Sequence, residues 1–342
     1  METLKEQTLQ MDYNAKCSSI YYIYYIIIQN GLIFNGFNGG ILKIIIGTRG
    51  SKLALTQTNY IKALLENLNE NIDIEVKIVK TTGDKDQSSK LSELGLGVFT
   101  KELDLKMLNN EIDIAVHSLK DVPTVWNENL TIASTPKRES YADLILWNKE
   151  DNDINIEKCN EKDNIIVGTS SIRRQEFLKI KYPNLKTKLL RGNVDTRLNK
   201  LRNKEYDAII LAEAGLNRLK MDLSDFNYER LNILPAPAQG VVGVASRTDN
   251  KEVISILQKI NHKKTFLEAL AERYALREYG GGCQAPFGAL SKYDEENKIL
   301  NLKCSVVIGN TIKSKEENIN CDIMDIEGAK NLGIKIGKYI KQ

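Results

Sequence analysis

The sequence predicts an α/β protein built from mainly parallel sheets, and two observations support this class. From Ile41 onward, apolar runs of strand length alternate with amphipathic runs of helix length, a pattern typical of parallel sheets with short connections. The 342 residues include 42% hydrophobic and 27% charged residues, which argues against disordered, collagen-like and membrane-spanning chains. This length predicts two or three domains, each with its own core.

The first strand–helix series begins just after residue 41. KIIIG (43–47) is typical of a buried strand, and Ser51 is placed to cap an amphipathic helix over 53–68. The elements expected next are a strand at 74–83, a helix at 101–110, a strand at 112–119 and an extended crossing at 132–147.

A second series follows the polar stretch 148–164, which we expect to be an exposed insertion. Its expected elements are strands at 165–171, 186–192 and 206–215 with helices at 172–182 and 194–203. A Pro-rich hinge, ILPAPAQG (233–240), leads into a strand at 241–247. The final block is expected to hold a helix at 265–279, the loop GGGCQAPFG (280–288), two strands and a terminal helix.

Residues 1–40 differ from the rest of the chain. Their apolar run Ile20–Ile28 is shorter than the roughly 20 residues that a membrane-spanning helix needs. The preceding segment mixes acidic and basic residues and so lacks the positive region of a signal peptide. Two interpretations of this segment remain open: a disordered N-terminal extension and a targeting leader.

The scarcity of histidine and the spacing of cysteine exclude several classes of site. His117 and His262 are the two histidines, which excludes HExxH proteases and three-histidine zinc sites. The five cysteines are widely spaced without a CxxC pair, so we predict no metal site and no disulfide framework. A net charge of +3 does not indicate nucleic-acid binding. His117 is expected to be a core histidine with satisfied hydrogen bonds.

Polar side chains collect where the predicted strands end, which is where ligands bind in open parallel sheets. Single arginines at such places are usually surface charges, but Arg173 and Arg174 start a helix and oppose its dipole. Together the residues predict an arginine-lined cleft between two α/β lobes, suited to several carboxylates or phosphates. They are Arg49, Ser51, Ser118, Lys120, Asp121, Thr169, Ser170, Ser171, Arg173, Arg174, Arg191, Asn193, Arg197 and Arg218.

Cys283 stands apart from the other cysteines because three glycines precede it and a proline follows three residues later. This composition predicts a tight loop. A thiol in an exposed loop is suited to act as a nucleophile or as an attachment point.

Five motifs in this order resemble the porphobilinogen deaminase family: AVHSLKDVP, VGTSSIRRQ, LRGNVDTRL, PAPAQG and GGGCQAPFG. The resemblance runs from about Ile41 to the C-terminus. It implies two lobes similar to type II periplasmic binding proteins and a small C-terminal α/β domain. The implied divisions are 41–136 with 241–258, then 142–234, then 263–342.

The resemblance also implies the chemistry. A dipyrromethane cofactor would be held by a thioether to Cys283, and four porphobilinogen molecules would be joined head to tail on it, each losing ammonia, before hydroxymethylbilane is released. Asp121 would transfer protons and stabilise the cationic intermediate. The arginines and their polar neighbours would bind the acetate and propionate groups, with Gln239 contributing nearby. The family's loop lysine is missing near Gly95–Gly97, where Lys85 and Lys90 could partly substitute.

Two other interpretations remain: a non-catalytic solute-binding module on the same fold, and a paralogue that has lost activity. We expect a monomer that binds a small-molecule substrate, with no nucleic-acid or membrane partner. Its expected location is the cytoplasm or a plastid-like organelle such as an apicoplast.

Overall fold

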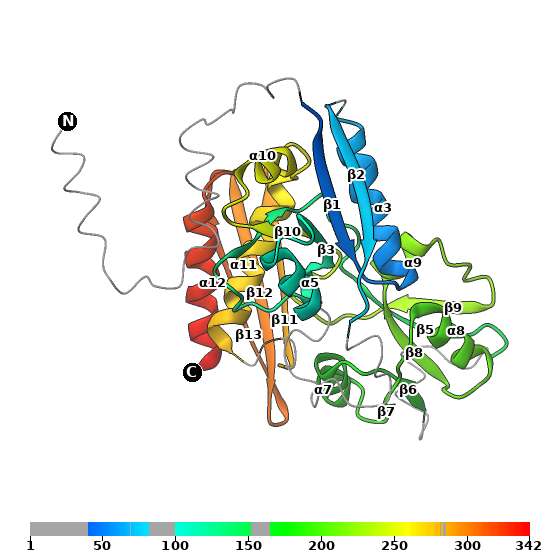
Figure 1. Ribbon diagram of the computed structural model, residues 1–342. Helices are drawn as coiled ribbons and strands as arrows, with labels where there is room; N and C mark the ends of the chain where they lie inside the picture. Colours follow the sequence, from blue (N-terminus) through cyan, green and yellow to red (C-terminus); the bar gives the residue numbers. More distant parts are fainter. Residues whose placement is uncertain (1–39, 69, 82–99, 152–164, 281, 283–284) are drawn as a thin grey trace.

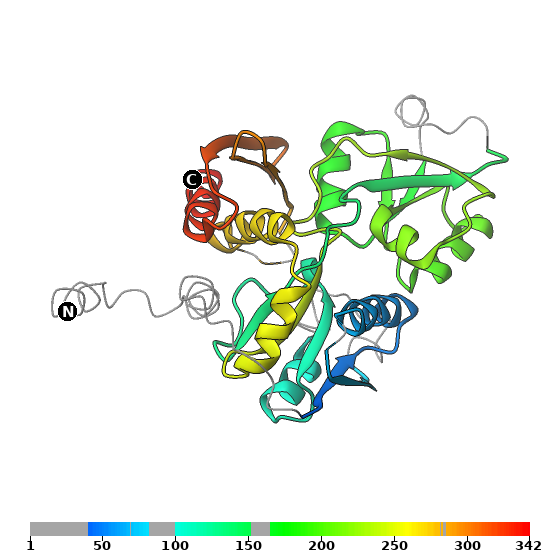
Figure 2. The same cartoon turned by 90° about the horizontal axis from the view of Figure 1, so that it is seen from above.

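The computed structural model describes residues 40–68, 70–81, 100–151, 165–280, 282 and 285–342 (Figure 1). These residues form two five-stranded sheets and one three-stranded sheet. Viewed from above, each sheet and its helices make a separate body (Figure 2). The described part of the chain holds no helix that is both long enough and apolar enough to cross a membrane.

The first five-stranded sheet is mixed rather than wholly parallel. Its strand order is β2 (Ile72–Ile78), β1 (Leu42–Thr48), β3 (Ile114–Ser118), β10 (Val242–Arg247) and β4 (Leu130–Ser134). The first three strands are parallel, and β10 is antiparallel to both of its neighbours. The helices of this lobe are α3 (Lys52–Glu66), α5 (Lys101–Leu108) and α10 (Lys251–Lys259).

The second sheet repeats this order and these directions. Its order is β7 (Lys186–Lys188), β6 (Ile166–Gly168), β8 (Ala208–Ala212), β5 (Asp143–Asn148) and β9 (Phe226–Arg230), with helices α7 (Ile172–Lys181), α8 (Val194–Arg202) and α9 (Glu213–Leu219). Here β5 takes the place of β10 and is antiparallel to both neighbours. In both lobes, therefore, the fourth strand comes directly from a crossing between the lobes.

The two crossings lie side by side. Glu139 N–H donates to the carbonyl of Gly240 at 3.0 Å, and Arg138 Nε donates to the carbonyl of Gln239 at 2.9 Å. Gly240 has φ +85°, and a Cβ there would lie 2.5 Å from the carbonyl oxygens of Glu139 and Ser140. The glycine of PAPAQG is therefore required for this close approach.

The third sheet is antiparallel, in the order β11 (Phe287–Asp294), β12 (Ile299–Ile308) and β13 (Thr311–Asn320), and packs against α11 (Lys263–Tyr279) and α12 (Ile326–Lys341). The two helices approach each other closely at Gly333 and Gly337 of α12. A Cβ on either glycine would lie within 2.6 Å of a carbonyl oxygen of α11. The sequence predicted two strands here and the structure has three.

Several element boundaries differ from the predicted ones. The strand expected at 206–215 ends at Ala212, where α9 begins, so Arg218 lies in a helix. The crossing expected at 132–147 contains the end of β4 and most of β5, and β9 was not predicted. Residues 1–39 and most of the expected insertion (152–164) lie outside the described residues.

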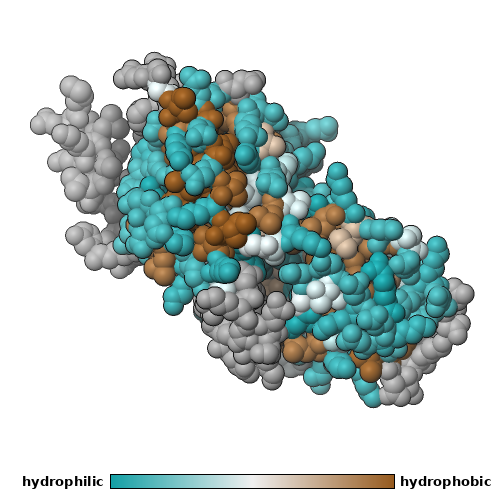
Figure 3. Space-filling model, turned by 45° about the vertical axis from the view of Figure 1, so that its right-hand side comes forward, coloured by the Kyte–Doolittle hydropathy of each residue, from teal (hydrophilic) through white to brown (hydrophobic). Residues whose placement is uncertain are grey.

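The surface is uneven in character. On the face shown in Figure 3, hydrophobic residues gather mainly on the upper part, and hydrophilic residues cover most of the lower part. The division into 41–136 with 241–258, 142–234 and 263–342 stays a prediction.

Candidate active site

A single 3-10 turn, η1 (Leu119–Asp121), follows β3 and presents Asp121. A backbone hydrogen bond fixes the turn to the second crossing: Leu119 N–H donates to the carbonyl of Val241 at 2.9 Å. The side chains of Leu119 and Val122 are buried, at 2% and 0% exposed. Lys120 is half-buried between them, whereas Asp121 is exposed. The fold thus anchors the turn by its apolar residues and leaves the Asp121 carboxylate accessible.

Lys120 connects this turn to the crossings. Its Nζ donates to Gln239 Oε1 at 3.4 Å. The Gln239 amide is buried and donates in turn to the carbonyl of Tyr141 and to Asp143 Oδ1, both at 2.8 Å. Burial lowers the pKa of Lys120, while the neighbouring Asp121 charge raises it. Gln239 therefore lies in the network around the predicted site, although its contacts here are with the protein.

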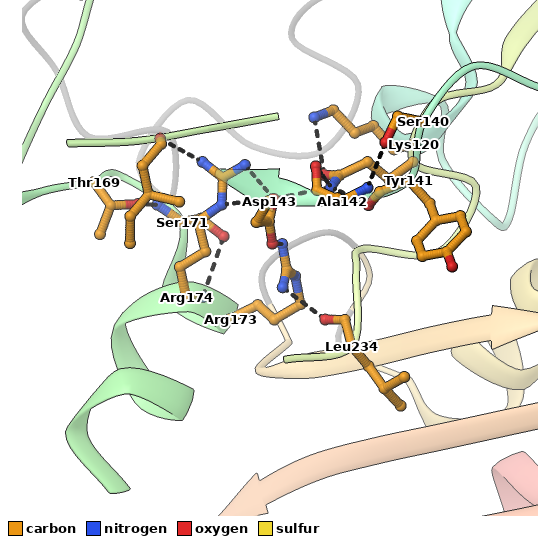
Figure 4. A network of polar contacts seen from close by, with 12 residues as sticks. Lys120, Ser140, Tyr141, Ala142, Asp143, Thr169, Ser171, Arg173, Arg174 and Leu234 are labelled. Atoms are coloured by element: carbon orange, nitrogen blue, oxygen red, sulfur yellow. Dashed lines mark hydrogen bonds and ion pairs between the residues drawn. The ribbon is translucent and has the colours of Figure 1, made fainter. Parts of the chain in front are cut away.

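Arg173 and Arg174 converge on Asp143, a residue that the sequence analysis did not single out (Figure 4). Arg173 Nη2 lies 2.7 Å from Asp143 Oδ2, and Arg174 Nη2 lies 2.6 Å from Oδ1. All three side chains are at most 8% exposed. Burial alone would raise the pKa of Asp143, but the two guanidiniums hold it well below its usual range.

The arginine pair is positioned by the start of α7. Ser171 is the N-cap, and its Oγ accepts from Arg174 N–H at 3.4 Å. The guanidiniums also donate to the carbonyls of Leu234 and Ile210, at 2.7 and 2.8 Å. Two buried cations against one carboxylate leave an excess of positive charge, which favours an anionic ligand nearby.

Arg191 and Arg197 extend this positive region. Burial lowers the pKa of Arg197 to about 10, helped by the charges of Arg174 and Arg191 and opposed by Asp121. Arg174, Arg191 and Asp121 therefore lie within electrostatic reach of the Arg197 guanidinium. Arg197 Nε donates to the carbonyl of Gly192 at 2.8 Å. By contrast, Arg191 Nε and Nη2 are buried without a hydrogen-bond partner among the residues that the structure describes.

The remaining predicted residues of the second lobe have mixed roles. Thr169 is buried, and its Oγ1 accepts from Ser171 N–H at 3.2 Å. Ser170 Oγ donates to the carbonyl of Leu190. Asn193 caps α8 by its backbone geometry and is exposed, with no side-chain capping bond. Arg218 Nη2 donates to the carbonyl of Gly240 at 2.6 Å, which ties α9 to the crossing.

On the first lobe, Ser51 caps α3 as predicted, its Oγ accepting from Ala54 N–H at 3.3 Å. Ser118 Oγ accepts from Gln57 Nε2 at 2.9 Å. His117 is buried as expected, and burial together with the charge of Arg49 lowers its pKa to about 4. Its Nε2 has no hydrogen-bond partner among the described residues, so the expectation of a satisfied ring was wrong on that atom.

An ion pair joins the two lobes near the site. Lys52 Nζ, at the start of α3, lies 2.9 Å from Asp195 Oδ2, at the start of α8. The sequence analysis named neither residue. Cys283, Lys85, Lys90 and Gly95–Gly97 lie outside the described residues.

Two family models cover almost all of the folded chain. Residues 44–255 match "Porphobilinogen deaminase, dipyromethane cofactor binding domain", and residues 266–342 match "Porphobilinogen deaminase, C-terminal domain". The chain belongs to the porphobilinogen deaminase family. The resemblance seen in the five motifs is thereby confirmed.

Curated relatives agree with this membership. The probable porphobilinogen deaminase of Methanocaldococcus jannaschii is 57% identical over 296 residues, which cover 86% of this chain and 99% of the relative. Porphobilinogen deaminase of Syntrophomonas wolfei is 42% identical over 250 residues, covering 72% of this chain and 80% of the relative. The chain is accordingly a transferase of porphyrin biosynthesis with hydroxymethylbilane synthase activity.

Some solved structures also resemble the chain, at low identity. The periplasmic VFT2 domain of Bordetella pertussis BvgS has a TM-score of 0.39 and 15% identity over 70% of this chain and 90% of that chain. The BenM effector-binding domain has a TM-score of 0.41 and 14% identity over 65% of this chain and 91% of that chain.

Proposed function

We propose that Asp121 is the catalytic carboxylate of this hydroxymethylbilane synthase, and that the surrounding arginines bind the carboxylates of the cofactor and of porphobilinogen. The observation that carries the proposal is the placement of one exposed carboxylate within a cluster of cations. Asp121, Arg174 and Arg191 all lie within electrostatic reach of Arg197, and Lys120 is adjacent to Asp121 in the same turn.

The described residues fit a dipyrromethane with its four carboxylates. Arg191 has two buried nitrogens without a partner among the described residues, and a guanidinium matches a carboxylate in a two-pronged geometry. Positive charge exceeds negative charge around Asp143. When bound, dipyrromethane supplies the ring to which the first substrate is joined. We assign its thioether attachment to Cys283, which follows the end of α11 by four residues.

The residues of the chain can serve the proton transfers of each condensation. Ammonia leaves porphobilinogen only after its amine is protonated, and the ring that attacks must later lose a proton. A carboxylate at Asp121 can exchange these protons and can stabilise the positive charge that develops on the substrate. Lys120 is half-buried and donates to Gln239, so its role is to position the turn and to attract anionic side chains.

A solute-binding module on the same fold is the second candidate, but the site argues against it. An exposed carboxylate among the arginines would repel an anionic solute and so weaken its binding. Such a carboxylate is useful only where positive charge develops.

We also propose that the enzyme is a monomer. The archaeal and bacterial relatives favour the cytoplasm over a plastid-like organelle.

The test compares Asp121→Glu with Asp249→Glu, a control in an exposed turn. Asp121→Glu moves the carboxylate by one methylene, so we expect turnover to fall at least roughly 10²-fold while the protein keeps its cofactor mass. Asp249→Glu should turn over at the parental rate. Parental turnover in Asp121→Glu would overturn the proposed role.

A further inference from the structure

Arg273, in helix α11 beside the third sheet, reaches across to the turn that carries Asp121. Its Nη1 donates to the carbonyls of Leu119 and Val122 at 3.1 and 2.9 Å. Its Nη2 donates to the carbonyl of Pro123 at 2.8 Å. The residue is 8% exposed, so these three bonds are largely shielded from water.

The three carbonyls flank the reactive part of the turn. Leu119 precedes Lys120 and Asp121, and Val122 and Pro123 follow them. The carbonyl of Leu119 also accepts from Val122 N–H at 3.2 Å, and the ends of short helices leave further carbonyls without helical partners. A planar guanidinium donates in fixed directions, so it sets the orientation of the peptides on both sides of Asp121. Arg273 therefore acts on the turn through its backbone.

The same helix leads into the proposed cofactor loop. From Arg273, α11 continues six residues to Tyr279, and Cys283 follows four residues later. The preceding residue, Glu272, accepts from Arg138 Nη1 at 2.6 Å and from Ala238 N–H at 2.6 Å. Helix α11 thus contacts both crossings and the catalytic turn, and it carries the chain toward the cysteine.

We propose that Arg273 is a positioning residue that fixes Asp121 relative to the cofactor-bearing end of α11. The proposal rests on the catalytic role proposed for Asp121. It predicts that loss of Arg273 changes the rate of condensation more than the binding of porphobilinogen, because the arginine supports the reacting carboxylate and does not itself hold the substrate.

The experiment measures kcat and KM of the cofactor-loaded holoenzyme for Arg273→Gln and Arg273→Lys. The matched control is Arg247→Gln, which removes a guanidinium that donates to the carbonyls of Met107 and Ile112 at 2.8 and 3.1 Å, away from the catalytic turn. We expect Arg273→Gln to lower kcat roughly 10- to 100-fold with little change in KM. Arg273→Lys keeps a cationic donor and should fall between Arg273→Gln and the parental enzyme. Arg247→Gln should lose stability but keep the parental kcat.

A second comparison isolates the route through Asp121. In an Asp121→Asn background, Arg273→Gln should lower the residual rate no further, because the positioned group is already lost. Equal kcat in the two Arg273 variants and Arg247→Gln would overturn the inference, as would full additivity with Asp121→Asn. Parental turnover in Asp121→Asn would instead overturn the catalytic role of Asp121, and this inference with it.

Discussion

The Asp143 carboxylate is bound twice by the guanidinium of Arg174, with its Oδ1 lying 3.2 Å from Nε and 2.6 Å from Nη2. Arg173 binds the other oxygen. Asp143, the first residue of β5, therefore binds two side chains from the first turn of α7. Gln239 also donates to Oδ1 at 2.8 Å, which connects the pair to the crossing and to Lys120. The buried carboxylate is thus the structural centre from which the arginines are placed.

Asp143→Asn should be strongly destabilising. It leaves two buried guanidiniums with no carboxylate, and breaking a buried pair in this way costs about 3–5 kcal/mol. Urea unfolding of the two proteins measures the difference. The control is Asp225→Asn, which removes the exposed partner of Arg202 and should cost under about 1 kcal/mol. Equal unfolding midpoints for the parental protein and Asp143→Asn would show that the pair does not stabilise the fold.

Arg191→Leu should block the binding of the cofactor without unfolding the lobe. Two of its nitrogens lack protein partners in the described residues, so the loss falls on a ligand and not on a protein contact. We expect the intact mass of purified Arg191→Leu to match the polypeptide alone. Arg202→Leu, in the last turn of α8, should keep the cofactor. A loaded Arg191→Leu protein would place the anion site elsewhere.

Glu268 should make the folded protein less stable as the pH rises. Burial raises its pKa from 4.5 to about 7, so between these values the folded state keeps a proton that the unfolded state has released. Stability is therefore lost as the pH rises from about 4.5 to 7. Glu268→Gln should be more stable than the parental protein at pH 8 by roughly 2–3 kcal/mol, and nearly equal to it at pH 4.

Chemical denaturation at several pH values tests this, with the exposed Glu296→Gln as the control. The parental protein and the control should share one pH profile. If Glu268→Gln followed that same profile, the pKa of Glu268 would be the same in the folded and the unfolded protein.

Much of the fold and of the site was predictable because both depend on local patterns. Ser51 caps its helix as expected, since a cap is a property of a few neighbouring residues. The partner of Arg173 and Arg174 was not predictable in this way, because Asp143 lies 30 residues earlier in the chain. The available signal was a single carboxylate, Asp143, directly before the apolar run at 144–147.

The strand pairing was missed for the same reason. Strands β5 and β10 enter their sheets from the crossings between the lobes, and their antiparallel direction depends on the path of the chain and not on residue periodicity. Local alternation therefore predicted mainly parallel sheets where the structure has mixed ones. The contacts of Arg273 with the turn that carries Asp121, over about 150 residues, likewise exist only in the folded molecule.

The most direct test of the central claim is intact-protein mass spectrometry of the parental enzyme and Cys283→Ser, before and after addition of porphobilinogen. We predict that the parental protein carries the extra mass of a dipyrromethane, located by digestion to the peptide containing Cys283, and that it gains further mass in steps of one deaminated porphobilinogen unit. Cys283→Ser should show the mass of the polypeptide alone and form no bilane. A dipyrromethane on Cys283→Ser, or a parental enzyme that turns over without any covalent addition, would contradict the account.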